Sequence, residues 1–247
     1  MSIESPADLI ALRKIGQIVA QALTEMRAKT EPGKTTSEID RAGERVMTRN
    51  DARSAPQIEY GFPAATCISV NDEVVHGTPG DRVLLSGDVV TVDVTAELDG
   101  YIADAAVTVV AGEASPQHRR LIGCAQHAFT KSLRYARAGR QIRQLGHAIE
   151  KQVRSEGFHV LPGLTGHGVG RRIHEPPNVP NFAARTSEKF TDGLVVTVEP
   201  IISTGSRNYY EFDDGWTTKT TDGSYAAHHE HTLVITKGKP IILTAAA

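Results

Sequence analysis

The stretch VVTVDVTAELDGYIADAAVTVV, residues 89–110, predicts a central β-hairpin and carries two acids that belong to a candidate site. Alternating apolar residues predict a strand on each side of Asp99-Gly100, a dipeptide favoured in two-residue hairpin turns because both residues tolerate positive φ. Counting back from that turn places Asp93 and Asp104 on one face of the hairpin as diagonal neighbours. Diagonal pairs lie roughly 7 to 8 Å apart at their backbones, so both carboxylates can reach one cation. A three-residue turn would break this parity.

Asp93 and Asp104 lie among valines in this pattern. Two buried carboxylates repel each other and lose hydration, and a divalent cation would offset both costs. Taken alone, the same pattern is equally compatible with a solvated sheet face that carries incidental acids.

Signals for helix ends predict two helices before the hairpin and two after it. A serine or threonine cap followed by proline or an acid opens a helix, and glycine closes one. The predicted helices run from Ser5-Pro6 to about Lys29, from Thr35 through Val46, from Ser115-Pro116 through Leu133, and from about Arg140 to Glu156 before Gly157. Period-two segments predict strands at 89–97, 101–109, 194–199 and 230–235. This order indicates an α+β fold of two similar halves around mostly antiparallel sheet, and we expect residues 1–247 to form a single domain.

Composition excludes several classes of function. The formal net charge is −2, with Lys and Arg spread along the chain, so we expect no binding to nucleic acid or to an anionic membrane. Cys67 and Cys124 are too few for a disulfide framework, which favours a reducing compartment. The sequence has neither a signal-peptide pattern nor the roughly 20 apolar residues of a spanning helix, and we expect a cytoplasmic protein.

Three further residues are candidates for a site, each on a weak signal. His167 lies between glycines in the segment TGHGVG, Glu199 ends an apolar run before Pro200, and Glu230 precedes another apolar run. Flanking glycines let a metal or substrate approach the backbone closely. Alone, such a histidine could equally be structural or exposed, and either acid could be a solvated strand end.

Their order and local context resemble the type I methionine aminopeptidases, metallopeptidases of the pita-bread fold, over nearly the whole chain. The matching stretches are GFPAATCISVNDEVVHG (61–77), GDVVTVDVTAELDGYIADAAV (87–107), TGHGVGRRIHEPP (165–177), VVTVEP (195–200) and HHEHTLVIT (228–236). The resemblance implies a dinuclear site between the two halves. The metal ligands that it implies are Asp93, Asp104, His167, Glu199 and Glu230. Two divalent ions, of cobalt, manganese, iron(II) or zinc, suit such an oxygen-rich set with one histidine.

The resemblance also implies catalytic and substrate-binding residues. Glu199 is the candidate general base for a bridging water that attacks the first peptide bond, and His76 and His174 match the family's active-site histidines. The implied pocket for the first side chain is formed by Phe62, Cys67, His76, His174 and Trp216. For Trp216 and Cys67 a role in the core remains open. We interpret His228, His229 and His231 as structural or supporting residues, because adjacent strand residues point to opposite faces.

Three positions depart from the family pattern. Tyr60 stands where a histidine is usual, Ala65 where a serine is common, and Ala105 where a hydroxyl residue is common. These changes leave the ligand set intact, and each could alter the hydrogen bonds around the site.

The sequence therefore predicts a metal-dependent aminopeptidase that removes N-terminal methionine, preferably before a small second residue. The expected partners are N-termini of nascent polypeptides or peptides, with the ribosome as a transient partner, and a monomer is expected. Two alternatives stay open: a proline-specific aminopeptidase of the same fold, and a non-catalytic pita-bread binding module.

Overall fold

The computed structural model describes residues 1–245, and its elements fall into two similar halves. The first half contains α1 (Pro6–Lys29), α2 (Thr36–Arg49), β1 (Arg53–Ser54), α3 (Ala55–Tyr60), β2 (Cys67–Val70), β3 (Glu73–Val75), β4 (Val89–Leu98) and β5 (Tyr101–Val110). The second half contains α4 (Pro116–Ser132), a 3-10 turn (Leu133–Tyr135), α5 (Ile142–Ser155), β6 (His159–Val160), β7 (Thr165–Gly168), β8 (Glu175–Pro180), β9 (Val195–Val198), β10 (Ile201–Ser203), β11 (Tyr209–Glu211), β12 (Thr218–Thr220), β13 (Ala226–His228), β14 (His231–Val234) and β15 (Ile241–Ile242).

The helix starts follow the capping signals in the sequence. The Ser5 side chain accepts a hydrogen bond from the Asp8 N–H, and the Thr35 side chain accepts one from the Glu38 N–H, which completes a capping box at each helix. Ser115 caps α4 in the same way, and Gly157 follows α5 with a φ of +85°. The four predicted helices are confirmed, with ends within two residues of the prediction except for α2, which continues three residues beyond Val46 to Arg49.

The hairpin of β4 and β5 has the predicted register. Asp99 and Gly100 have φ values of +52° and +78°, which is the conformation of a tight hairpin turn. Thr95 pairs with Asp104, and Asp93 pairs with Ala106. The two acids therefore share a face of the sheet, as the sequence predicts.

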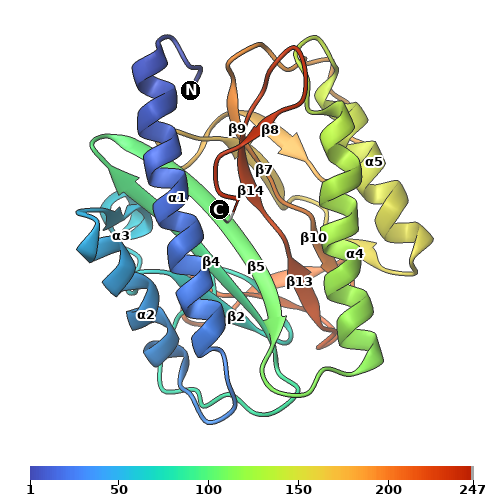
Figure 1. Cartoon of the computed structure of the whole chain (residues 1–247). Helices are drawn as coiled ribbons and strands as arrows, with labels where there is room; N and C mark the ends of the chain where they lie inside the picture. Colours follow the sequence, from blue (N-terminus) through green and yellow to red (C-terminus); the bar gives the residue numbers. More distant parts are fainter. Residues whose placement is uncertain (246–247) are drawn as a thin grey trace.

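The sheets are antiparallel and meet between the two halves. In the first half β4 pairs with β5 on one edge and with β2 and β1 on the other, and the main sheet of the second half has the order β15-β14-β9-β7-β8. Smaller sheets have the orders β13-β10-β6 and β11-β12-β3. The halves join where the Glu230 N–H donates to the Ala106 carbonyl, 2.9 Å away, and Val107 bridges to His229. Figure 1 shows this join, with α1 and α2 on one side and α4 and α5 on the other.

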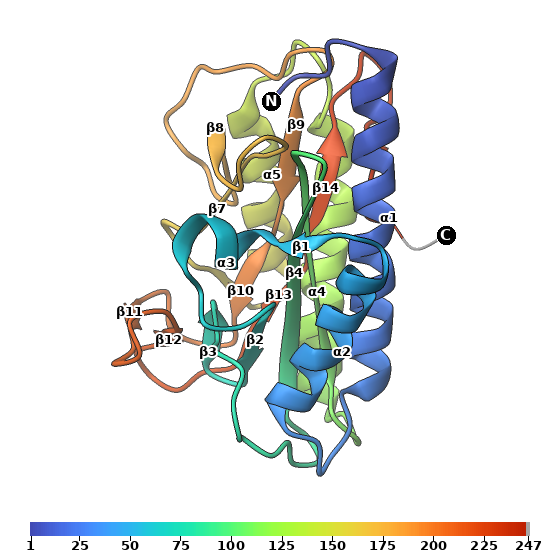
Figure 2. The same cartoon turned by 90° about the vertical axis from the view of Figure 1, so that its left-hand side faces the viewer.

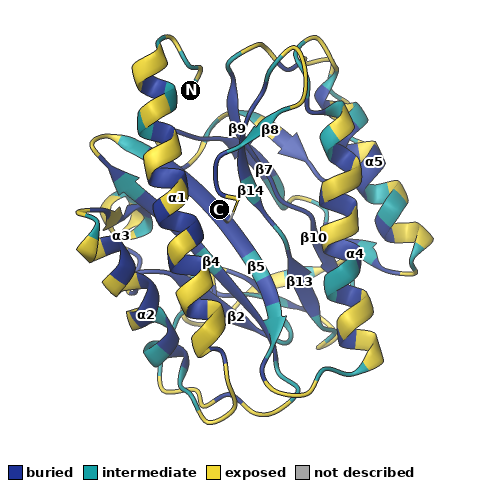
Figure 3. Ribbon diagram, viewed as in Figure 1, coloured by how far each residue is buried: buried dark blue, intermediate teal, exposed yellow. Residues whose placement is uncertain are grey.

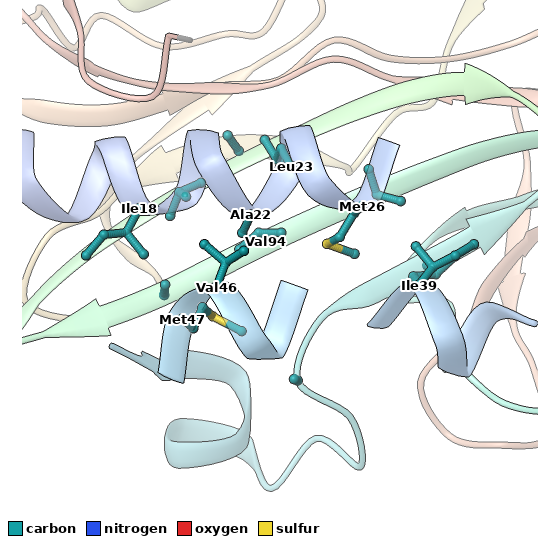
Figure 4. Close-up of a cluster of buried hydrophobic side chains, with 14 of the residues drawn as sticks. Ile18, Ala22, Leu23, Met26, Ile39, Val46, Met47 and Val94 are labelled. Atoms are coloured by element: carbon teal, nitrogen blue, oxygen red, sulfur yellow. The ribbon is translucent and has the colours of Figure 1, made fainter. Parts of the chain in front are cut away.

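Each half has its own apolar core beneath its helices. Ile18, Ala22 and Leu23 of α1 pack with Val46 of α2 and Val94 of β4 (Figure 4). In the second half, α4 and α5 contribute residues such as Leu121 and Ile149 to a cluster with Val198. Figure 3 shows the buried strands between helices whose outer faces are exposed.

The short helix α3 lies on the face of β4 opposite to α1 (Figure 2) and was not predicted. Its local signals are present: the Ser54 side chain accepts from the Gln57 N–H, Pro56 lies in the first turn, and Gly61 ends the helix with a φ of +70°. Within residues 1–245, no helix has the length and apolar character needed to cross a bilayer.

Candidate active site

A cavity of about 300 Å³ lies at the join between the two halves. Its walls include every residue that the sequence analysis assigned to a site. Those residues are Phe62, Cys67, His76, Asp93, Asp104, His167, His174, Glu199, Trp216 and Glu230. The structure therefore brings the predicted site residues together, while their individual roles stay predictions.

The candidate ligands come from separate strands on both halves. Asp93 lies on β4 and Asp104 on β5, Glu199 follows β9, and Glu230 lies between β13 and β14. Asp104, Glu199 and Glu230 are each less than a tenth exposed. The convergence of these strands at the join makes one acidic cluster.

The donor atoms form two groups that share one residue. Asp93, His228 and Glu230 make one group, and Asp104, His167 and Glu230 make the other, with the donor atoms of each group within 4.8 Å of one another. A carboxylate shared by two groups can bridge a pair of cations. Each group thus offers three donors to a divalent cation, with Glu230 common to both.

Hydrogen bonds fix the protonation and orientation of His167. Its Nδ1 lies 2.9 Å from the Gly168 carbonyl oxygen, which can only accept, so Nδ1 carries the proton. The lone pair of a neutral His167 is then on Nε2, which lies 3.5 Å from Glu199 and 4.0 Å from Asp104. This is the tautomer that a metal ligand needs.

Glycines around His167 allow the strands to approach closely. A Cβ atom at Gly166 would lie 2.5 Å from the Thr197 carbonyl oxygen, and one at Gly168 would lie 2.3 Å from the Pro176 carbonyl oxygen. Thr197 in turn accepts the His167 N–H at 3.0 Å. The glycines flanking His167 thus set its distance from the acids.

Threonine hydroxyls orient two of the carboxylates. Thr95 donates to Asp104 at 2.8 Å, and Thr197 donates to Glu199 at 2.7 Å. By contrast, Asp93 Oδ1 and Glu230 Oε1 are buried without a hydrogen-bond partner in the described part of the chain. Unpaired carboxylate oxygens in a buried site are costly unless a cation satisfies them.

Burial disfavours the charged form of these acids. Desolvation, followed by repulsion from Asp104, raises the pKa of Asp93 well above its usual value, and desolvation with repulsion from Glu230 does the same for Glu199. Desolvation and Asp104 raise the pKa of Glu230, and desolvation raises the pKa of Asp104 to about 6. Divalent cations reverse this effect because they favour the ionised form. The residues present therefore fit a divalent metal centre.

The histidines predicted as catalytic both border the cavity. His76 has a φ of +57°, an uncommon conformation for a residue with a side chain, and it presents its ring to the cavity. Although His76 is exposed at the cavity, desolvation by the surrounding residues, followed by repulsion from His174 and His228, lowers its pKa to about 4. Desolvation also lowers the pKa of His174, whose ring centroid lies 4.3 Å from that of His167. Both rings are neutral at pH 7.

An apolar wall closes one end of the cavity. The rings of Phe62 and Trp216 meet edge to face, with centroids 5.2 Å apart, beside Cys67. Trp216 is half-buried and lines the cavity, so it does not serve as a core anchor. Burial raises the pKa of the Cys67 thiol, which stays protonated as an apolar part of the wall.

The departures from the family pattern have different environments. Ala65 and Ala105 are buried in the apolar cluster under α1. Tyr60 lines the cavity, and its hydroxyl contacts His174. His228, which we interpreted from the sequence as a structural or supporting residue, lies among the donor atoms. Its spacing in the sequence could have indicated this position, because His228 lies two residues before Glu230 and strand residues two apart share a face.

Comparisons with known proteins agree with this geometry. The model of metallopeptidase family M24 matches residues 11–237. Methionine aminopeptidase 2 of Bacillus subtilis is 45% identical over 247 residues, with 99% of each chain covered. The crystal structure of a methionine aminopeptidase from Thermotoga maritima has a TM-score of 0.95 and 36% identity, with 99% of each chain covered.

A solved prolidase from Pyrococcus furiosus has a TM-score of 0.81 at 21% identity, and the alignment covers 99% of this chain and 66% of the prolidase. That likeness shows a shared fold alone. The matches over the full length confirm the pita-bread fold and the family that the sequence motifs indicated. The chain belongs to metallopeptidase family M24, among the type I methionine aminopeptidases.

Proposed function

We propose that this chain is a metal-dependent aminopeptidase that removes the N-terminal methionine from peptides and nascent proteins, preferably before a small second residue. The observation that carries the proposal is the pair of donor groups that share Glu230 beside an apolar wall in one cavity. Relatives named methionine aminopeptidase, 35 to 45% identical over the whole chain, support the same activity.

The proposed cofactor is a pair of divalent ions held by Asp93, Asp104, His167, Glu199 and Glu230. When bound, such ions polarise a scissile carbonyl and lower the pKa of a water. Cobalt, manganese, iron(II) and zinc all suit these donors. The orphaned oxygens of Asp93 and Glu230 support metal occupancy, because a cation would satisfy them.

Glu199 is the proposed general base. It accepts the proton of the attacking water as the water oxygen bonds to the first peptide carbon, and it returns the proton to the leaving amine as the C–N bond breaks. The hydrogen bond from Thr197 holds Oε1 of Glu199 in place, 3.5 Å from His167 Nε2, while Oε2 lies 3.8 Å from His228 Nε2, so both oxygens face the donor cluster.

His174 and His76 are proposed to donate hydrogen bonds to the substrate. Both are neutral at pH 7, and a neutral imidazole can donate without bringing a second positive charge next to the metal ions. We assign His174 to the carbonyl oxygen, where negative charge develops, and His76 to the peptide next to it.

The apolar wall is proposed to bind the first side chain. Phe62, Cys67 and Trp216 offer aromatic edges and a sulfur atom, which suit a thioether and exclude water. An unbranched side chain without sulfur, such as norleucine, would gain only the apolar part of these contacts, so the preference for methionine over norleucine tests this assignment.

We further infer that residues 1–247 act as one catalytic domain, in the cytoplasm, as a monomer that meets the ribosome transiently. Ligands drawn from both halves support the single domain, since neither half alone contains the donor set. Residues 246–247 lie outside the described residues.

Cleavage of Met-Ala-Ser, Met-Lys-Ser and Ala-Pro-Ser by metal-stripped protein tests the proposal, with manganese, cobalt, iron(II) and zinc added separately and Glu199→Ala as the control. The expected result is metal-dependent release of methionine from Met-Ala-Ser, and its loss in the variant. Cleavage of Ala-Pro-Ser alone would make the protein a prolyl aminopeptidase. No cleavage with any metal would leave a binding module.

A further inference from the structure

His228 is a second imidazole in the acidic cluster, and the five-residue ligand set does not include it. It is 2% exposed and lies at the end of β13, next to the join between the halves. Its Nε2 atom lies 3.3 Å from Glu230 Oε2 and 3.8 Å from Glu199 Oε2. Its backbone is fixed on both sides by Thr108, which donates to the His228 carbonyl and accepts its N–H, each at 2.8 Å.

Both ring nitrogens of His228 are buried without a hydrogen-bond partner in residues 1–245. The 3.3 Å contact with Glu230 therefore lacks the angles of a hydrogen bond, although its length would allow one. Donors bound side by side to one ion with bonds of about 2.1 Å lie roughly 3 Å apart and point at the ion rather than at each other. The contact between His228 and Glu230 has this character.

The two donor groups make the placement specific. His167 is the imidazole of the group that contains Asp104, and His228 is the imidazole of the group that contains Asp93, with Glu230 common to both. Each donor group thus contains one aspartate, one histidine and the shared Glu230.

We propose that His228 is a metal ligand through Nε2, which gives the ion held by Asp93 its own imidazole and makes the centre a six-residue site. This proposal rests on the proposed metal-dependent function. An imidazole at each ion raises the affinity for iron(II), cobalt and zinc relative to manganese, because nitrogen donors suit those metals better than hard oxygen donors alone.

His229 provides a matched control on the same segment. His229 is half-buried. Its ring points to the opposite face from His228 and packs edge to face with Phe129, with centroids 5.2 Å apart. Replacing His229 alters packing next to Glu230 without removing a donor from the cluster.

Cobalt titration of the metal-stripped protein tests the proposal, with wild type, His228→Gln and His229→Gln followed by calorimetry and by proton NMR. Each imidazole bound to cobalt contributes one strongly shifted, solvent-exchangeable N–H signal. We expect two such signals and two bound ions in wild type and in His229→Gln. In His228→Gln we expect one signal, with the second ion bound at least tenfold more weakly and the first unchanged.

Two bound ions with a single imidazole signal in wild type would overturn the proposal, and so would unchanged cobalt affinity in a folded His228→Gln. Thermal unfolding of each metal-free variant reports whether that variant folds. The number of imidazole signals in wild type tests the proposal even if a variant does not fold. Absence of metal binding by wild type would instead refute the metal-dependent function on which the proposal rests.

Discussion

The hydroxyl of Tyr60 lies 2.7 Å from Nδ1 of His174, across 114 positions of sequence. Tyr60 ends α3, and its neighbour Glu59 accepts the N–H of Ile173, so the end of this helix holds the His174 loop at two points. If the Tyr60 hydroxyl accepts a hydrogen bond from Nδ1–H of His174, then Nε2 is unprotonated and can only accept. If the hydroxyl donates to Nδ1, then Nε2 of the neutral ring carries the proton. The second arrangement presents a donor to the substrate, as the proposed role of His174 requires.

Tyr60→Phe should lower kcat with little change in KM for Met-Ala-Ser. A hydrogen bond of this kind contributes about 0.5–1.5 kcal/mol, so the expected loss is roughly twofold to tenfold. Tyr60→His, which introduces the residue usual in the family, should recover part of the loss. Tyr210→Phe is the control, because Tyr210 is as exposed as Tyr60, at 45%, but does not line the cavity. Equal kinetics for wild type and Tyr60→Phe would contradict the positioning role.

Trp216→Leu should weaken the preference for methionine over norleucine at the first position. Contacts between a thioether and an aromatic ring contribute about 0.3–1.5 kcal/mol, and norleucine lacks the sulfur. The ratio of kcat/KM for Met-Ala-Ser to that for norleucyl-Ala-Ser should therefore fall about twofold to tenfold in the variant. A ratio that stays at the wild-type value would mean that Trp216 only closes the cavity.

The stability of the metal-free protein should depend on pH more strongly than that of the metal-bound protein, because its buried acids titrate. The pKa of Asp104 is raised to about 6, so its contribution to stability is complete below its unfolded value and is lost as the pH rises through about 6. Buried histidines such as His228, whose pKa is lowered to about 4 by desolvation, contribute stability that increases as the pH rises, so the pH dependence of wild-type stability combines both effects.

Comparison with Asp104→Asn isolates the carboxylate contribution. The unfolding temperature of metal-free Asp104→Asn minus that of wild type should increase from pH 4.5 to pH 7. Saturating manganese should remove the trend in wild type, because bound cations stabilise the ionised acids. A difference that is constant across this pH range would show that Asp104 is not desolvated in the metal-free state.

Gly166→Ala should destabilise the protein and misplace His167. The added methyl group would lie 2.5 Å from the Thr197 carbonyl oxygen, so β7 and β9 must separate. Overpacking of this kind costs about 1–3 kcal/mol. Gly123→Ala is the matched control: the nearest atom to its new methyl group is 3.9 Å away, and alanine favours the helix α4 by about 0.5–1 kcal/mol. Equal unfolding temperatures for the two variants would refute the close approach at Gly166.

Structural features that depend on neighbouring residues could be predicted from the amino-acid sequence. The Asp99-Gly100 turn fixed the register of β4 and β5 and put Asp93 and Asp104 on one face, because the side-chain period of a strand is two. Capping residues fixed the helix starts, because the first N–H groups of a helix need local acceptors. The ligand set came from motif order, through the family resemblance.

The way in which distant segments meet became visible with the three-dimensional fold. It paired the β5 and β14 segments so that Glu230 is shared by two donor groups, placed Trp216 on the cavity wall, and brought Tyr60 to His174. It also gave His228 a place among the donors, where adjacent histidines in HHEH look alike in sequence. These relationships depend on packing between residues more than 100 positions apart, and no local rule of propensity or periodicity specifies such contacts.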